Sequence, residues 1–212
     1  MTEMMHSPNT QLHHADLDES FLKLCRAEGK VAWDIETSGL DWRADRIATC
    51  QVAAGKAIAV VRFSGRERPE RLIGLLEDKA VMKVFHHAPF DLRFMSYQWR
   101  ASPISVACTK VASKILDPQL DNSEHSLMPI LSRRLGIQIS KAQQRSNWLA
   151  EELTAAQLDY AATDVRHLLS LLASELNEAR QRGLEHLILQ SFDYIPCRVA
   201  LDLLGAGDVY AY

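Results

Sequence analysis

The chain has 212 residues, 47% of them hydrophobic and 24% charged, with a formal net charge of −3 and a pI of about 6.2. This composition is typical of a globular domain and excludes the broad basic surface of a protein that coats long nucleic acid. No apolar run is long enough to cross a bilayer, and the polar opening lacks the apolar core of a secretory signal. We therefore expect a cytoplasmic protein that does not bind membranes, with its four scattered cysteines as buried thiols.

The first half of the chain predicts a polar, flexible leader over residues 1–20, followed by strands and helices. Helical spacing of apolar residues, and short apolar runs bounded by turn residues, locate these elements. The expected helices span 19–29, 69–80 and 89–99, and the expected strands span 30–36, 46–55, 56–63, 81–87 and 104–109. The first three strands are close in sequence and joined by turns, which indicates an antiparallel meander.

From about residue 110 onward, nearly every segment has helical periodicity. Strands with interleaved helices, followed by helices alone, predict an α/β domain with a mixed central sheet and flanking helices. We expect this domain over residues 21–180. A helical tail over 181–212 is expected to pack on the domain or on a neighbouring subunit.

The apolar stretch VAWDIETSGL, residues 31–40, contains two carboxylates that a buried strand disfavours. Side chains two residues apart in a strand point to the same face, so Asp34 and Glu36 would lie next to each other. Burying two like charges is costly unless a positive group neutralises them. Either a divalent cation does so, or both residues lie at a strand end in solvent.

Two later segments have the same acidic character. Asp91 in HHAPFDLRFM opens an apolar helix, and Tyr160 and Asp164 in LDYAATDVRHLL are four apart on one helical face beside the core. Taken singly, Asp91 could be a helix N-terminal carboxylate favoured by the helix dipole, and the other two could be a surface pair. Together with Asp34 and Glu36, these carboxylates supply the oxygen ligands that hard divalent cations require.

The order of these motifs resembles that of the DEDDy 3′-to-5′ exonucleases of the ribonuclease D group: Asp-x-Glu, then FHHAPFD, then Tyr-x-x-x-Asp. This resemblance covers about residues 31–172. The segments CTKVASKILD, HSLMPILSRRLGIQISKAQQRSNW and SFDYIPCRVALDLLG are further similar to the nanoRNase C branch, which degrades dinucleotides and very short RNAs. The resemblance implies an RNase H-like (DnaQ-like) exonuclease fold with a mixed sheet.

The resemblance also implies a role for each motif residue. Asp34, Glu36, Asp91 and Asp164 would hold two divalent cations, Mg²⁺ or Mn²⁺, at which the 3′-terminal phosphodiester is hydrolysed to a nucleoside 5′-monophosphate. Tyr160 would orient the attacking water or deprotonate it. Because a phenol has an ordinary pKa of about 10, the orienting role is favoured. The family further implies a homo-oligomer, with an octameric ring as the assembly it points to.

Candidate substrate contacts in this family include the turn after the first motif, which here implies Thr37 and Leu40. Leu40 could wedge against a base, or pack inward as an ordinary loop leucine. His87 is a further candidate. Because adjacent residues of a strand face opposite ways, at most one of His86 and His87 would face the site.

The segment KAQQRSNW offers charge and hydrogen bonds to a phosphate backbone through Lys141, Gln144, Arg145 and Ser146. The alternative for these residues is a solvated helix start. Trp148 could stack on a base, but it is expected in the core.

These observations favour an exoribonuclease that acts on short single-stranded RNA, dinucleotides above all. The sequence lacks the helical RNA-binding domains that follow the catalytic domain in ribonuclease D, so long structured RNA would be held weakly. A general 3′-to-5′ exonuclease on longer RNA or DNA has the same catalytic residues. An inactive RNase H-like module that only binds nucleic acid would lack at least one carboxylate, and all four are present.

Overall fold

The computed structural model describes residues 9–140, 142–143 and 146–211. Its strands are β1 (Thr10–His14), β2 (Lys30–Thr37), β3 (Ile47–Ala54), β4 (Ala57–Arg62), β5 (Met82–Phe85) and β6 (Val106–Cys108). Its α-helices are α1 (Glu19–Glu28), α2 (Glu70–Leu76), α3 (Ala88–Gln98), α4 (Thr109–Leu116), α5 (Leu127–Leu135), α6 (Ala155–Arg166), α7 (Leu168–Gln181) and α8 (Glu185–Leu204). A 3₁₀-helix, η1, spans Asn122–His125.

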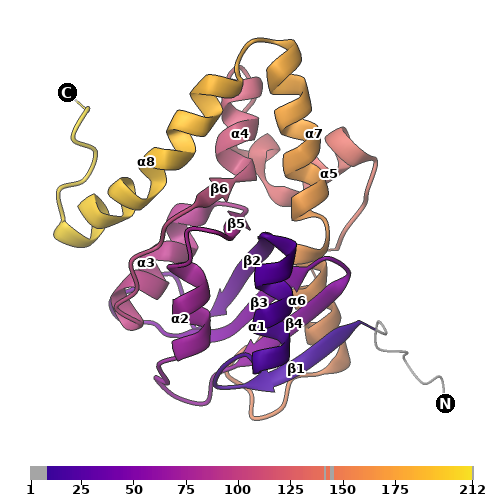
Figure 1. Ribbon diagram of the computed structural model, residues 1–212, viewed down its shortest axis with the longest axis vertical. Coiled ribbons are helices and arrows are strands. Elements are labelled where there is room, and N and C mark those ends of the chain that lie inside the picture. Colours follow the sequence, from indigo (N-terminus) through magenta and orange to yellow (C-terminus); the bar gives the residue numbers. More distant parts are fainter. Residues whose placement is uncertain (1–8, 141, 144–145, 212) are drawn as a thin grey trace.

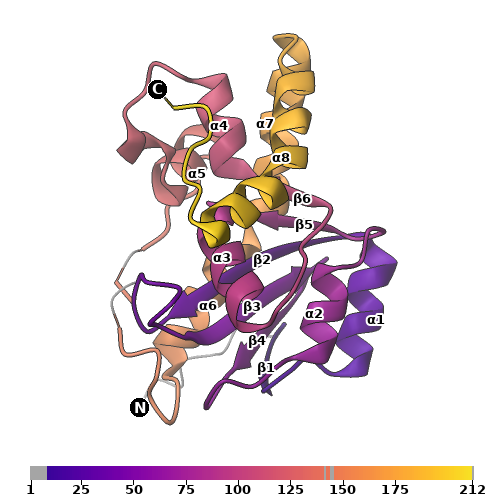
Figure 2. The same cartoon turned by 90° about the vertical axis from the view of Figure 1, so that its left-hand side faces the viewer.

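The strands form one six-stranded mixed sheet in the order β1-β4-β3-β2-β5-β6. Antiparallel pairing joins β2 to β3 and β3 to β4, which confirms the predicted meander. β5 and β6 continue the sheet parallel to β2. Helices α1 and α2 lie together on one side, while α6 and α7 contact the sheet from the other (Figures 1 and 2). The predicted α/β class with a mixed, helix-flanked sheet is therefore confirmed.

The predicted flexible leader over residues 1–20 is wrong for its second half. Residues 10–14 form β1, an edge strand parallel to β4, and α1 begins at Glu19. Asp18 caps α1 by accepting a hydrogen bond from the Phe21 backbone N–H at 2.7 Å, and Leu17 is only 1% exposed. Backbone pairing to β4 and one buried leucine therefore order this polar segment.

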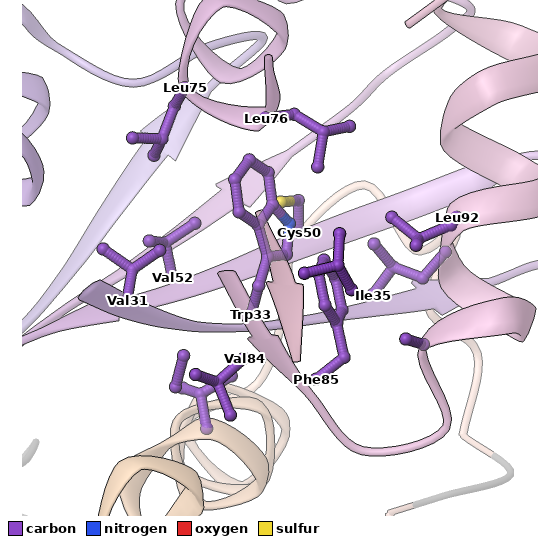
Figure 3. Close-up of a cluster of buried hydrophobic side chains, with 14 of the residues drawn as sticks. Val31, Trp33, Ile35, Cys50, Val52, Leu75, Leu76, Val84, Phe85 and Leu92 are labelled. Carbon is purple, nitrogen blue, oxygen red and sulfur yellow. The ribbon is translucent and has the colours of Figure 1, made fainter. Parts of the chain in front are cut away.

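Side-chain alternation along β2 separates a dry face of the sheet from a polar one. Val31, Trp33 and Ile35 point into the main core, where they meet Leu75 and Leu76 of α2 (Figure 3). Trp33 stacks on Phe85 with ring centroids 6.0 Å apart, and Cys50 and Val52 of β3 complete this layer. Since the period of a strand is two, Asp34 and Glu36, at the alternate positions of β2, point to the opposite face.

The predicted C-terminal tail is helical and packs on the domain itself. α8 contacts α3, α4 and β6, and lies obliquely across them in Figure 1. Its buried side chains are Ile188, Phe192, Ile195 and Val199. Cys25, Cys50 and Cys108 are buried as expected, whereas Cys197 on α8 is exposed, which corrects the expectation for that thiol. Among the described residues, no helix is long and apolar enough to cross a membrane.

Candidate active site

β2 brings the first two carboxylates to the α6 side of the sheet. Asp34 and Glu36 pair in register with Gln51 and Thr49 of β3, which share that face and are buried. The Gln51 side-chain amide donates to the Thr49 hydroxyl at 2.8 Å. A polar layer therefore lies beside the two acids, as the alternation of β2 predicts. Thr49 and Gln51 were not singled out in the sequence, because their polarity is meaningful only once β3 is placed against β2.

α6 brings Tyr160 and Asp164 to the same place. The helix begins with a capping box. The Thr154 hydroxyl accepts a hydrogen bond from the Gln157 backbone N–H at 3.2 Å, and the Gln157 side-chain carbonyl accepts one from the Thr154 backbone N–H at 3.0 Å. Leu158, Ala161 and Val165 bury the face that packs on the sheet, as predicted. This packing fixes the rotation of α6, so both functional side chains face β2.

Asp91 enters from the first turn of α3, directly after β5. It is 3% exposed, and its Oδ1 accepts a hydrogen bond from the Ile35 backbone N–H at 3.2 Å. Ile35 lies between the two acids of β2, so this bond ties the fourth carboxylate to the first motif. A helix-dipole role for Asp91 alone does not account for that placement.

Three of the four acids converge closely enough to hold a cation. Asp34, Glu36 and Asp164 each place one carboxylate oxygen within 4.8 Å of the others. Across the described ranges 9–140, 142–143 and 146–211, no Lys, Arg or His nitrogen lies within 4.0 Å of any of the four carboxylates. An all-oxygen donor set without a protein counter-charge fits a hard divalent cation.

The electrostatics of the cluster show the cost of gathering these acids. Burial raises the pKa of Asp34 well above its ordinary value, and the charges of Asp91, Asp164 and Glu36 raise it further. Burial, followed by the charges of Asp164 and Asp91, raises the pKa of Glu36 to about 9. Burial raises the pKa of Asp164 to about 7, although a hydrogen bond with the Tyr160 hydroxyl, one turn away, lowers it in part. A positive charge in the cluster would stabilise all of these carboxylates in their ionised form.

Tyr160 is positioned by the residues that follow the KAQQR segment. Its ring packs at 45° on that of Trp148, with centroids 6.0 Å apart, and Trp148 is 4% exposed, as predicted for a core residue. Gln157 donates to the Ser146 hydroxyl and to the Asn147 carbonyl, both at 3.1 Å. Burial, and then the nearby carboxylates, raise the pKa of Tyr160, so its hydroxyl stays protonated at neutral pH.

A cavity of about 790 Å³ joins the acids to most of the predicted substrate contacts. Its lining includes Asp34, Glu36, Asp91, Tyr160 and Asp164, together with Thr37, Leu40, His87 and Ser146. Leu40 is 82% exposed, so the alternative in which it packs inward is wrong. Lys141, Gln144 and Arg145 lie outside the described residues.

Both histidines after β5 line the cavity, contrary to the expectation that at most one could. The strand ends at Phe85, so the alternation argument does not extend to His86 and His87. His87 instead precedes α3 with a left-handed backbone, at φ 74°. His86 contacts the Thr109 hydroxyl at 2.8 Å, and burial lowers its pKa to about 3, so it is neutral.

Sequence reasoning missed two cations of the cavity wall, Arg93 and Lys110. Burial, and then the charges of Lys110 and Arg93, lower the pKa of His87 to about 4, which shows that these cations lie around it. Lys110 is in the first turn of α4, directly after β6. Ligands of open parallel sheets bind beyond the carboxyl ends of the strands, and this rule is the signal that could have identified Lys110.

The 3′-5′ exonuclease family matches residues 11–179 of this chain. Ribonuclease D of Desulfotalea psychrophila is 36% identical over 94 residues, which cover 44% of this chain and 24% of that relative. The chain spans about a quarter of the length of the curated relatives it matches first. Family membership therefore concerns the exonuclease domain of these larger proteins.

Solved structures give a match over nearly all of the chain. The structure of Brucella melitensis NrnC bound to pGG is 34% identical, with a TM-score of 0.89, and the match covers 97% of this chain and 100% of that one. NrnC with bound Mg²⁺ is 33% identical, with a TM-score of 0.88 and coverage of 96% and 99%. The predicted resemblance to the ribonuclease D group and nanoRNase C, and the DnaQ-like fold, are confirmed. The chain belongs to the 3′-5′ exonuclease family.

Proposed function

We propose that this protein is a metal-dependent 3′-to-5′ exoribonuclease that hydrolyses short RNA, dinucleotides above all, to nucleoside 5′-monophosphates. The convergence of Asp34, Glu36 and Asp164 within 4.8 Å, in one cavity with Asp91 and Tyr160, carries this proposal. These five residues make up the DEDDy set. The likeness to NrnC bound to pGG supports a short substrate.

The four carboxylates would hold two divalent cations, Mg²⁺ or Mn²⁺. Such ions lower the pKa of a bound water and neutralise charge on a phosphodiester. The likeness to NrnC with bound Mg²⁺ supports Mg²⁺. The cluster itself supports binding, because Asp34, Glu36 and Asp164 converge within 4.8 Å and a cation would relieve the repulsion between their charges.

Tyr160 would orient the attacking water rather than deprotonate it. Its raised pKa keeps the phenol protonated at neutral pH, so the hydroxyl can donate one hydrogen bond and accept another. The packing of its ring on Trp148 fixes the position of the hydroxyl. Asp164, one helical turn away, lies on the same face of α6.

The charge distribution in the cavity supports a short, phosphorylated substrate. The lining holds both the four carboxylates and two cations, Arg93 and Lys110, which we call the basic wall. A dinucleotide with a 5′ phosphate has two phosphates to place, one at the acidic cluster and one against the basic wall. The cavity volume of about 790 Å³ lies within the usual range for small-molecule sites. Thr37, Leu40 and Ser146 would contact the bases and sugars.

Turnover as a function of RNA length tests this proposal against a general exonuclease on longer RNA or DNA. We would follow 5′-labelled RNA of two, three, five, seven and twenty nucleotides with Mg²⁺ or Mn²⁺ and resolve the products over time. We expect the dinucleotide to be consumed much faster than the others. Rates that are flat or rise with length would instead favour the general exonuclease, and no turnover at all would favour a module that only binds nucleic acid.

We further propose that the protein acts in the cytoplasm as a homo-oligomer, and the family resemblance points to an octameric ring. Several apolar side chains of the C-terminal region are exposed, which supports self-association. These are Leu187, Leu189 and Leu204 of α8, followed by Val209 and Tyr210. Light scattering on the purified chain measures the subunit number directly.

A further inference from the structure

Arg93 lies where α3, the cavity wall and the C-terminal helix meet. It lines the cavity that holds the four carboxylates, and its side chain is 29% exposed. Its Nε donates to the Pro89 carbonyl at 2.9 Å, one turn back on α3. One terminal nitrogen lies 3.7 Å from a carboxylate oxygen of Asp202, in the last turn of α8. The guanidinium is therefore held by two contacts, one with the Pro89 carbonyl of its own helix and one with Asp202 of α8.

Asp202 is itself fixed by a second arginine. Its other oxygen contacts Arg198 at 2.8 Å, one turn earlier on α8, and its side chain is 12% exposed. Arg198 in turn donates to the Gly207 carbonyl at 2.9 Å, just past the end of the helix. Ile195 and Val199, which are buried, hold this part of α8 on the domain. The carboxylate that meets Arg93 is thus supported by a connected set of contacts.

The position of Arg93 matters because the cavity contains strong competing attractions. Asp91 lies two residues away on α3, and the charge of Arg93 acts to lower the pKa of Asp91. An arginine without a fixed partner would be drawn toward the four clustered carboxylates, since opposite charges attract. Asp202, which contacts the guanidinium and is not among the lining residues of the cavity, opposes that movement and leaves the remaining N–H groups available to a phosphate.

We propose that Asp202 is a positioning residue for substrate binding: α8, through Asp202, holds Arg93 at the basic wall of the cavity, where Arg93 binds the 5′ phosphate of the substrate. This inference rests on the proposed exoribonuclease function. It gives the C-terminal helix a part in substrate recognition, although α8 contributes no residue to the cavity lining in the described part of the chain.

The test compares guanosine dinucleotides with a 5′ phosphate and with a 5′ hydroxyl. For Asp202→Asn we expect the KM of the phosphorylated substrate to rise about threefold to tenfold with little change in kcat. The KM of the 5′-hydroxyl substrate should stay unchanged. Arg198→Gln, a second variant, should shift the same KM less and in the same direction, and Asp202→Glu should restore part of the loss.

Glu185→Gln is the matched control, because Glu185 pairs with Arg180 at 2.7 Å at the other end of α8. It should behave like the wild type with both substrates. In an Arg93→Gln background, Asp202→Asn should have no further effect on KM, since both changes remove one contact. An additional loss in that background, or equal KM changes for both substrates, would overturn the inference.

The same measurements separate this inference from the proposed function. If the wild type hydrolyses neither dinucleotide with Mg²⁺ or Mn²⁺, the proposed function fails and the inference fails with it. If the wild type hydrolyses both and Asp202→Asn leaves their KM ratio unchanged, the inference alone fails. Unfolding midpoints of each variant verify that the compared proteins are folded.

Discussion

Asp34 is the residue at which function and stability oppose each other most directly. Burial raises its pKa, and the charges of the three other carboxylates around it raise that pKa further. We predict that Asp34→Asn lowers turnover more than about 100-fold, because a ligand of the cations is lost. The same change should leave the unfolding midpoint without metal unchanged or higher, since it removes a carboxyl that burial and its neighbours make costly to ionise. Kinetics and thermal unfolding in EDTA measure both effects.

Asp159→Asn is the control for this substitution, because Asp159 is exposed on α6 and next to Tyr160. It should change neither turnover nor the unfolding midpoint appreciably. Substantial activity of Asp34→Asn would contradict the assignment of the metal site.

The raised pKa values of Glu36 and Asp164 make the metal-free protein sensitive to pH. In the folded state these carboxyls hold protons up to about pH 9 and 7, well above the ordinary values that apply in the unfolded chain. The folded state therefore binds more protons, and its stability should fall as pH rises from about 4.5 through 7 to 9. Urea midpoints in EDTA at pH 5, 7 and 9 test the sign.

Mg²⁺ should reduce this pH dependence, because it favours the ionised carboxylates and binds only the folded chain. Asp164→Asn should also reduce it in EDTA, by removing one of the titrating groups. A urea midpoint that rises over the same pH range in EDTA would show that the cluster is not under the electrostatic repulsion described above.

At the scale of elements, α6 depends on one buried amide. Gln157 is 4% exposed and joins the capping box of the helix to the Ser146–Asn147 segment. We predict that Gln157→Leu lowers the free energy of unfolding by about 1–3 kcal/mol, because its part-buried hydrogen bonds to Thr154, Ser146 and Asn147 are lost. It should also lower kcat, because Trp148 and Tyr160 lose their common support. Gln190→Leu, at an exposed position of α8, should do neither.

The elements also show what the sequence could and could not reveal. The period of two in β2 and the spacing of four in α6 placed Asp34, Glu36, Tyr160 and Asp164 correctly, because these patterns are local. β1 was missed, since TQLHH has no continuous apolar face and becomes a strand only by pairing with β4, about 50 residues later. The positions of Arg93 and Lys110 in the cavity wall likewise depend on tertiary contacts, so local patterns in the sequence could not reveal them.

At the scale of the whole molecule, α8 is part of the folded domain. It covers α3, whose first turn carries Asp91, and it contacts β6 and α4 (Figure 2). The ends of the parallel strands β2 and β5 lie at the cavity that holds the carboxylates, and α3 follows β5 directly. Any loosening of α8 is therefore expected to disturb the candidate active site through α3, both by packing and through the contact between Asp202 and Arg93.

Phe192→Ala tests whether α8 is part of the folded domain. Phe192 is 4% exposed in the middle of α8, so its truncation should cost about 3–5 kcal/mol of unfolding free energy through lost burial and a cavity. Leu187→Ala, where the leucine is 44% exposed, should cost under about 0.5 kcal/mol within one subunit. If self-association buries Leu187, its cost should instead grow with protein concentration, because association stabilises the folded state by mass action. Urea unfolding of both variants at two protein concentrations separates these effects. A Phe192→Ala protein as stable as the wild type would show that α8 is an appendage rather than part of the core.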